Sequence, residues 1–291
     1  MARRASRADP HRVPFNGRFS IRHFPTSPPR GTPAKDALQD ELMDRVDELD
    51  RLQQLLFADE RYAVLAVFQA MDAAGKDSTI RKVFSGVNPA GFRVHAFGRP
   101  SELELRHDFL WRCVSRLPER GRIGIFNRSH YEEVLVVRVH PGLLAAQNLP
   151  GAQGEYIWRQ RFESIRGFER HLADNGTVIV KFWLNVSRRE QAERLRERIE
   201  DPDKNWKFRP GDLDDRAQWG RFMKAYEQML RATSRPWAPW YAIPADDKHY
   251  ARVAVARVMV ATLKGLRLRY PPVGDEQRRE LAEGLRRLAR E

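Results

Sequence analysis

The sequence has very little cysteine and no long hydrophobic run. Its single cysteine, Cys113, excludes a disulfide within the chain and is typical of a protein from a reducing compartment. No apolar stretch approaches the ~20 residues that a membrane helix needs. The basic N-terminus lacks the apolar segment of a secretory signal. We therefore expect a cytoplasmic protein without a membrane partner, in which Cys113 is an unreactive core residue.

Negative charge is also scarce relative to positive charge. The chain has 52 lysines and arginines against 39 aspartates and glutamates, a formal net charge of +13. Only nine of the basic residues are lysines, and arginine is the side chain suited to bidentate phosphate contacts. Such a surface attracts nucleic acids, nucleotides and inorganic phosphate chains alike. Charge thus indicates either a polyanionic partner or a charged surface without a binding role, and it identifies no ligand.

Length and periodicity predict one large α/β core. With 291 residues, of which 42% are hydrophobic and 31% charged, the chain is long enough to bury such a core. Strand-like and helical segments alternate, which is typical of a parallel sheet with helices on both faces. We expect strands at 62–69, 92–97, 123–126, 177–184 and 240–243, and helices at 34–58, 77–84, 101–117, 155–173, 187–200, 213–232 and 248–268.

Composition divides the chain further. Residues 1–33 are rich in arginine, proline, serine and glycine, and we expect an arm that is partly ordered against the body, residues 34–270. The segment at about 198–216 contains a long polar and aromatic stretch, which is typical of a mobile lid. Residues 271–291 predict a charged tail helix without a continuous apolar face.

The segment Ala70–Thr79 carries the strongest chemical signal. It follows the apolar strand at 62–69 and leads into a helix that we expect to begin at Asp77. A strand, a tight glycine turn and a helix N-terminus together bind phosphate through backbone N–H groups, and a lysine adds a point charge. Ala70 replaces the first glycine of the usual pattern, and Asp77 replaces its Ser or Thr. The predicted phosphate-binding residues are Ala73, Ala74, Gly75, Lys76, Asp77 and Ser78.

Other polar segments are expected beside this turn. Ligands of doubly wound folds lie beyond the carboxyl ends of the strands, where Asn127–Glu133 and the start of the helix at 187–200 also emerge. Simpler interpretations exist for several of these residues. Asp72 is also suited to bond its own backbone in the turn, and Glu132 and Glu133 to favour a helix N-terminus. Arg194 and the bases of segment 201–210 are equally typical of a solvated face, His130 of a structural histidine, and Trp206 and Phe208 of lid packing.

Three motifs together resemble the polyphosphate kinase 2 family. Gln69–Asp77, Phe126–Glu132 and Asp201–Phe208 are similar to its Walker A, Walker B and lid motifs, in the expected order. The pair Lys76-Asp77 most resembles the members that phosphorylate both AMP and ADP, often called class III. The resemblance implies a thymidylate-kinase-like P-loop fold with a helical lid, Mg²⁺ as cofactor, and inorganic polyphosphate as donor to AMP or ADP. It also implies dimers or tetramers, and no nucleic-acid partner.

The resemblance implies a role for each matching residue. Lys76 would hold the donor's terminal phosphates, and Asp72 would bind Mg²⁺ or align the attacking nucleotide oxygen. Asn127, Arg128 and Glu132 would hold the acceptor phosphate and the metal. Glu133 would assist at the nucleotide, although related sequences commonly have Glu-Asp where this chain has Glu132-Glu133. The residues implied to close over the transferring group are Arg194, Lys204, Lys207 and Arg209.

Two other functions are considered. An ATP-dependent nucleoside or nucleotide kinase on the same fold is one, but Ala70 and Asp77 break the usual triphosphate-binding pattern. A nucleic-acid-binding protein is the other, suggested by an isoelectric point near 10.3. The sequence lacks the aromatic and basic recognition motifs of the usual nucleic-acid modules. The favoured hypothesis is a polyphosphate-dependent nucleotide kinase that uses Mg²⁺ and works reversibly.

Overall fold

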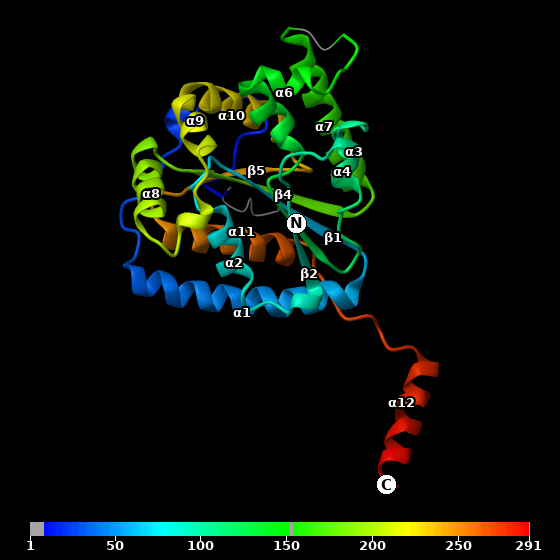
Figure 1. Ribbon diagram of the computed structural model, residues 1–291. Coiled ribbons are helices and arrows are strands. Elements are labelled where there is room, and N and C mark those ends of the chain that lie inside the picture. The colour runs from blue at the N-terminus through cyan, green and yellow to red at the C-terminus, as the bar shows by residue number, and fades with distance from the viewer. Residues whose placement is uncertain (1–8, 152–153, 291) are drawn as a thin grey trace.

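The central element is a parallel sheet of five strands. In a computed structural model, which describes residues 9–151 and 154–290, the strand order is β2-β3-β1-β4-β5 (Figure 1). All four strand pairs of this sheet are parallel, so the expected sheet is confirmed. The strands are β1 (Ala63–Gln69), β2 (Phe92–Ala96), β3 (Ile123–Asn127), β4 (Thr177–Asn185) and β5 (Trp240–Pro244).

Four of the strands, β1, β3, β4 and β5, are largely buried because helices cover both faces of the sheet, whereas β2 at one edge is partly exposed. Every residue of β1 is buried, as expected for a central parallel strand that reads as a continuous apolar run. The helices α1 (Lys35–Asp59), α2 (Lys76–Phe84) and α11 (Lys248–Gly265) pack together over one face (Figure 1). The opposite face is covered by α7 (Tyr156–Asp174) and α10 (Trp219–Thr233).

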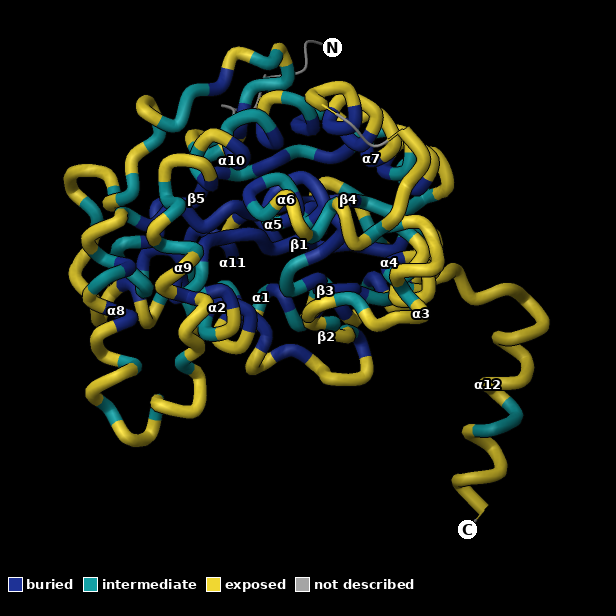
Figure 2. The backbone as a smooth tube through the Cα atoms, turned by 45° about the horizontal axis from the view of Figure 1, so that its top comes forward, coloured by how far each residue is buried: buried dark blue, intermediate teal, exposed yellow. Residues whose placement is uncertain are grey.

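Aromatic side chains fill much of the core. Phe68 on β1 stacks on Phe182 of β4 with ring centroids 4.9 Å apart, and Trp183 and Trp240 are fully buried. The dark core of Figure 2 follows the strands and the inner faces of the helices. Cys113 belongs to this core, and burial raises the pKa of its thiol to about 12. No helix in the described part of the chain is long and apolar enough to cross a bilayer.

Two expected helices are interrupted. Instead of one helix over 101–117, the structure has α3 (Glu102–Leu105) and α4 (Trp111–Val114). Ser101 does cap the first, in a capping box with Glu104. The carboxylate of Asp108 then accepts from the N–H of Leu110 at 2.9 Å, a local bond that competes with a continuous helix.

The helix expected over 213–232 is also divided. Residues Gly211–Ala217 form α9, Gln218 leaves helical geometry, and α10 begins at Trp219. The break lets α9 turn its acids toward Arg198 and His140, while α10 packs against α7. The remaining elements are α5 (Val136–Val139), α6 (Pro141–Ala145), α8 (Arg188–Glu200), and the 3₁₀ turns η1 (Ile21–His23), η2 (Pro89–Gly91), η3 (His130–Val134) and η4 (Asn205–Lys207).

The two ends of the described chain differ in how they meet the body. The N–H of Val13 donates to the carbonyl of Trp240 at 2.9 Å, and the arm forms an antiparallel bridge from Arg12 to Tyr241. The arm therefore covers the free edge of β5, which protects it from unwanted pairing. Residues 1–8 of the expected arm lie outside the described residues.

The last helix, α12 (Asp275–Leu288), projects away from the body (Figures 1 and 2). None of its described residues is buried. Leu281, Leu285 and Leu288 lie four and three residues apart, on one side of the helix, and are exposed. The expectation of no continuous apolar face was therefore wrong, because the leucines form a stripe among the charges.

Candidate functional site

The loop between β1 and α2 is built around the ammonium group of Lys76. Lys76 is the first residue of α2, and its side chain is buried. Its Nζ donates to the carbonyl oxygens of Ala70 at 2.7 Å and Met71 at 3.3 Å. Gly75 has φ +99°, a left-handed conformation that glycine adopts without a steric penalty. We call residues 70–76 the phosphate loop; it holds a cation beside the N-terminus of a helix.

Burial strongly affects the charge of Lys76. Its pKa is lowered chiefly by burial, although the carboxylates of Asp72 and Glu132 act to raise it. A cation held in place by carbonyl groups, with little water around it, is well suited to attract phosphate oxygens. Of the predicted phosphate-binding residues, Ala73, Ala74 and Gly75 precede α2, and Lys76, Asp77 and Ser78 are its first three residues.

Asp72 and Arg128 form the ion pair that joins the loop to the end of β3. Arg128 Nη2 lies 2.6 Å from Asp72 Oδ1. Burial acts to raise the pKa of Asp72, but the charges of Lys76 and Arg128 outweigh it and the pKa is lowered. Arg128 has φ +62°, which is uncommon for a residue other than glycine. Its N–H donates to the carbonyl of Phe68 at 3.0 Å, so the strand end itself holds this conformation.

Asn127 and Glu132 complete the group of residues that the sequence predicted at this edge. Asn127 Nδ2 donates to Asp77 Oδ1 at 2.6 Å, which links the end of β3 to the first turn of α2. Glu132 lies on the 3₁₀ turn η3. Burial raises the pKa of Glu132, while the charges of Arg128 and Lys76 act to lower it. Glu132 is in turn the largest cause that raises the pKa of Arg128.

Two carboxylates and two cations therefore share one partly buried site, which we call the charge cluster: Asp72, Lys76, Arg128 and Glu132. The described residues contain no group of three or more potential metal-ligating His, Cys, Asp or Glu side chains. Mg²⁺, however, is commonly bound by only one or two carboxylates together with substrate phosphates and water. The donor set of Asp72 and Glu132 therefore fits Mg²⁺ with a bound phosphate chain.

Glu133 has different partners from its neighbour Glu132. Its Oε2 lies 2.9 Å from Arg161 Nη1 on α7, and the same nitrogen donates to its backbone carbonyl at 2.8 Å. Gln147 also donates to Glu133 Oε2, at 2.7 Å. The structure thus places Glu133 in a buried ion pair that joins η3 to α7, and shows no contact with Arg128 or Lys76.

The side chain of Arg194 donates a hydrogen bond to a backbone carbonyl of the phosphate loop. Its Nη1 donates to the carbonyl of Ala74 at 2.8 Å, and its Nη2 to the carbonyl of Ala245 at 2.6 Å. Its Nε donates to Glu190 at 2.8 Å. The side chain is buried, so the alternative of a solvated face is excluded. Its donors hold the loop in shape instead of pointing at free space.

The predicted lid bases are placed farther from these contacts. Lys204 forms ion pairs with Glu197 at 2.7 Å and Asp201 at 2.5 Å, which raise its pKa. Lys207 and Arg209 are exposed, and Lys207 lies over the ring of Trp206. Trp206 was expected to pack in the lid but is 77% exposed. In the described parts of the chain, none of these bases has a side-chain bond to the phosphate loop.

Several residues at the site carried no strong signal in the sequence. Gln191, three residues before Arg194, donates to the carbonyl of Asp72 at 2.9 Å. Arg198, one helical turn after Arg194, acts on Asp72 by its charge and pairs with Asp212 on α9 at 3.3 Å. The spacing of Gln191, Arg194 and Arg198 along one helix face was the available signal.

A buried network of hydrogen bonds and an ion pair holds η3 in place. Lys181 Nζ on β4 lies 2.6 Å from Glu169 Oε2 on α7 and 2.8 Å from the hydroxyl of Tyr131. That hydroxyl donates to Glu169 Oε1 at 2.6 Å. Lys181 is fully buried, and burial lowers its pKa to about 8. Because Tyr131 immediately precedes Glu132, the network holds the turn that carries this carboxylate.

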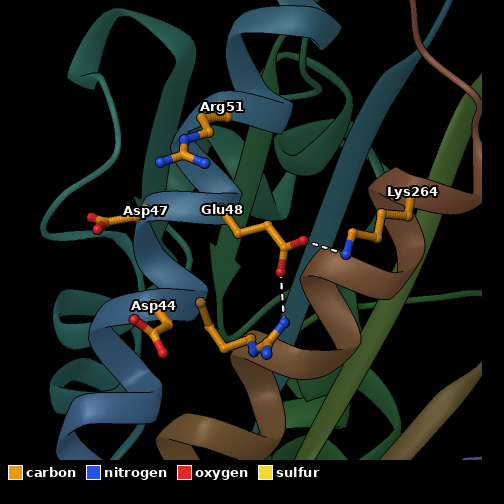
Figure 3. A pocket seen from close by; sticks show the side chains of 6 residues that line it. Asp44, Asp47, Glu48, Arg51 and Lys264 are labelled. Atoms are coloured by element: carbon orange, nitrogen blue, oxygen red, sulfur yellow. Dashed lines mark hydrogen bonds and ion pairs between the residues drawn. The ribbon is translucent and has the colours of Figure 1, made fainter.

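A separate hollow lies between α1 and α11 (Figure 3). Glu48 accepts from Arg45 at 2.6 Å and also from Lys264, as the dashed lines in Figure 3 show. The lining has equal numbers of acids and bases: Asp44, Asp47, Glu48, Arg45, Arg51 and Lys264. Since its charges compensate one another, this hollow offers no net field for a phosphate ligand.

Comparisons with known proteins find relatives over most of the chain. The family model of polyphosphate kinase 2 matches residues 33–270. The chain is 48% identical to an ADP-polyphosphate phosphotransferase of Rhodopseudomonas palustris, over 94% of this chain and 95% of the relative. It is also 48% identical to an AMP/ADP-polyphosphate phosphotransferase of Meiothermus ruber, over 90% and 94%.

A solved structure shows the same fold. The polyphosphate kinase 2 from Arthrobacter aurescens TC1 superposes with a TM-score of 0.84 at 36% identity, over 94% of this chain and 95% of that one. The range of the family model includes the phosphate loop, η3 and the lid segment. The chain therefore belongs to the polyphosphate kinase 2 family.

Proposed function

We propose that this protein transfers the terminal phosphoryl group of inorganic polyphosphate to AMP or ADP, and that the reaction is reversible. The observation that carries the proposal is the charge cluster, in which Lys76 and Arg128 lie with Asp72 and Glu132 at the carboxyl ends of β1 and β3. The names of the relatives from R. palustris and M. ruber support the choice of donor and acceptor.

Phosphoryl transfer asks a protein mainly for positioning and charge neutralisation. A terminal phosphate oxygen of the nucleotide forms a bond to the last phosphorus of the chain, and the bridging bond behind that phosphorus breaks. The leaving oxygen stays on the shortened chain, and no covalent bond to the protein forms. Lys76 binds the phosphate at the loop, and Arg128 holds the nucleotide's phosphate beside it. Both sides of the reaction are phosphoanhydrides, so substrate ratio decides its direction.

Mg²⁺ is the proposed cofactor, and Asp72 and Glu132 are the residues that would hold it. When bound, the ion neutralises charge on the phosphate oxygens. Asp72 is also placed to align the nucleotide, since Arg128 and Gln191 fix its side chain and its carbonyl. Asn127 positions the first turn of α2 through Asp77. Arg194 acts as a positioning residue of the loop.

The lid is the part of the site that must move. Lys204, Lys207 and Arg209 lie on the largely exposed segment between α8 and α9, which is mostly yellow in Figure 2. We propose that these bases approach the bound chain when the segment closes, and that closure excludes water. Glu133 is proposed to support the nucleotide site only indirectly, through its ion pair with Arg161.

We further propose that the enzyme works in the cytoplasm as a homo-oligomer, dimer or tetramer, without a nucleic-acid or membrane partner. The exposed stripe of Leu281, Leu285 and Leu288 supports self-association. In α12 and the two residues after it, segment 275–283 holds four carboxylates and two arginines, whereas 284–290 holds three arginines and no acid. Two such helices are therefore complementary in charge when antiparallel. Light scattering of the full chain and of a Leu285→Glu variant tests this association.

The deciding experiment is a donor–acceptor matrix with purified protein. AMP, ADP, GMP and GDP are combined with short polyphosphate, long polyphosphate or ATP as donor, with and without Mg²⁺. The proposal predicts Mg²⁺-dependent turnover of adenine nucleotides with polyphosphate. Turnover of AMP with ATP but not with polyphosphate would instead support the ATP-dependent kinase. Tight binding of duplex DNA that long polyphosphate fails to displace would support a nucleic-acid-binding protein.

A further inference from the structure

A second hollow lies at the β2 edge of the sheet and shares no lining residue with the phosphate loop. It has a volume of about 130 Å³ and lies between β2, the start of β3 and the segment 115–122. Arg93 on β2 pairs in register with Gly124, whereas Asn127 at the catalytic edge is the last residue of β3. A Cβ on Gly124 would lie 2.9 Å from the Pro118 ring. The glycine therefore lets segment 115–122 pack directly on the sheet and form one wall.

Positive charge in this hollow is largely uncompensated. Arg93 and Arg116 line it, are exposed, and have no side-chain hydrogen bond or ion pair in the described parts of the chain. The acid that lines it, Glu119, is engaged by Arg122, with Nε and Oε2 3.1 Å apart. The hollow of Figure 3 differs, because its acids and bases are equal in number.

His95 lies within reach of both free arginines. Burial lowers the pKa of His95, and the charges of Arg116 and Arg93 lower it further. The imidazole also lies edge-on to the ring of Phe126, with centroids 6.2 Å apart. Burial and the two arginine charges therefore both disfavour the protonated imidazole, and a bound anion would offset the effect of the arginines.

We propose that the hollow formed by Arg93, His95 and Arg116 binds a phosphate group of an inorganic phosphate or a short phosphate chain. Guanidinium groups match phosphate oxygens in bidentate geometry. The volume is well below the ~300 Å³ at which ligand pockets begin, so it suits one phosphate group and excludes a nucleotide. This site is separate from the charge cluster, and the proposal does not depend on the proposed transfer reaction.

Binding at this hollow must be coupled to the proton on His95. An anion beside the imidazole favours the charged imidazolium, so it raises the pKa of His95. By linkage, the anion binds more tightly below that pKa than above it. The charged groups that line the hollow together with the imidazole are Arg93, Arg116, and the Arg122–Glu119 pair.

The test is an NMR titration of the full-length protein labelled at histidine, without nucleotide or Mg²⁺. A His95→Gln variant assigns the His95 signal among the eight histidines. We expect orthophosphate and tripolyphosphate to raise the pKa of His95 by about one unit or more, as an opposite charge at close range does. Sodium chloride at matched ionic strength should produce only a small part of this pKa shift.

Variants test whether the pKa shift of His95 arises from binding at this hollow. The double variant Arg93→Gln with Arg116→Gln should lose the shift, whereas Arg120→Gln, an exposed neighbour that does not line the hollow, should keep it. The shift should also persist in Lys76→Ala, which separates this hollow from the phosphate loop. An unchanged His95, an equal shift with chloride, or a shift that survives the double variant overturns the proposal. A shift produced by a DNA duplex but by neither inorganic phosphate overturns it in favour of nucleic acid.

Discussion

Arg194 Nη1 lies 2.8 Å from the carbonyl oxygen of Ala74, so a buried guanidinium on α8 holds the phosphate loop by its backbone. The other end of the same guanidinium donates to Ala245, at the end of β5. One side chain thus connects the loop to the end of β5, an edge strand of the sheet. The loop's shape is set by contacts from outside it, and the variants of Arg194 are the most direct test of this.

Arg194→Lys should lower kcat with little change in the KM for nucleotide. A lysine keeps the charge but has no planar fork to reach two carbonyl groups at once. We expect a loss of about tenfold to a hundredfold, because small displacements of the phosphate site are costly. The control is Arg196→Lys, an exposed position on the same helix. Steady-state kinetics that show no difference between the two variants would contradict the positioning role.

Lys76→Ala should remove most turnover. Removal of one preorganised charge-stabilising group commonly costs about 10²–10³ in kcat. The free energy of unfolding should change little, since burial of the ammonium itself opposes folding. Lys82→Ala, exposed on the same helix, is the matched control. Near-full activity of folded Lys76→Ala protein would show that the phosphate-loop assignment is wrong.

Substitutions of the adjacent residues Glu132 and Glu133 should affect different properties, the first catalysis and the second stability. Glu132→Gln should lose catalysis and the response to Mg²⁺ while the variant keeps its melting temperature, because this carboxylate belongs to the charge cluster. Glu133→Gln should mainly lower stability, by on the order of 3 kcal/mol, since Arg161 is left as a buried charge without its partner. Thermal unfolding and Mg²⁺ titrations of both variants distinguish these roles. Equal effects on both properties would argue against the assignment.

The Lys181–Glu169 pair allows stability to be separated from catalysis. Lys181→Met leaves the carboxylate of Glu169 buried and unpaired, which should cost about 3–5 kcal/mol. Adding Glu169→Leu should recover much of that stability, because well-packed apolar pairs often replace buried ion pairs without loss. We expect kcat to stay reduced in the double variant, since Tyr131 loses both partners that hold η3. Full recovery of kcat would mean that the network serves folding alone.

Cys113 should be chemically silent in the folded protein. Its pKa is raised from 9.0 to about 12 by burial, so the thiol stays protonated throughout the pH range in which enzymes work. Because the thiolate is the reactive form, iodoacetamide at pH 8 should label the native protein only very slowly. Denaturation in guanidinium should allow complete labelling within minutes. Rapid labelling of native protein would show that this part of the core opens.

Local patterns determined much of this protein. The continuous apolar run of β1 predicts a strand buried on both faces, and the helix that follows Gly75 and Lys76 begins where the turn ends. These features depend on residues close together in the chain, so period and turn chemistry are sufficient to find them. The order of strand and helix along the chain likewise predicted the parallel sheet, and motif resemblance predicted which strand ends carry the charge cluster.

Long-range contacts decided the remainder. Glu132 and Glu133 are neighbours with the same side chain, and only the 3₁₀ turn and Arg161 on a distant helix direct one to the cluster and the other to an ion pair. In the sequence, Arg194 resembles the other arginines of its helix. Only the folded structure places it beside the carbonyl of Ala74. In the sequence, Lys181 interrupts an otherwise apolar strand. In the folded protein it pairs with Glu169 and donates a hydrogen bond to Tyr131. Such roles depend on which elements meet, and a linear pattern carries no information about partners brought together only by packing.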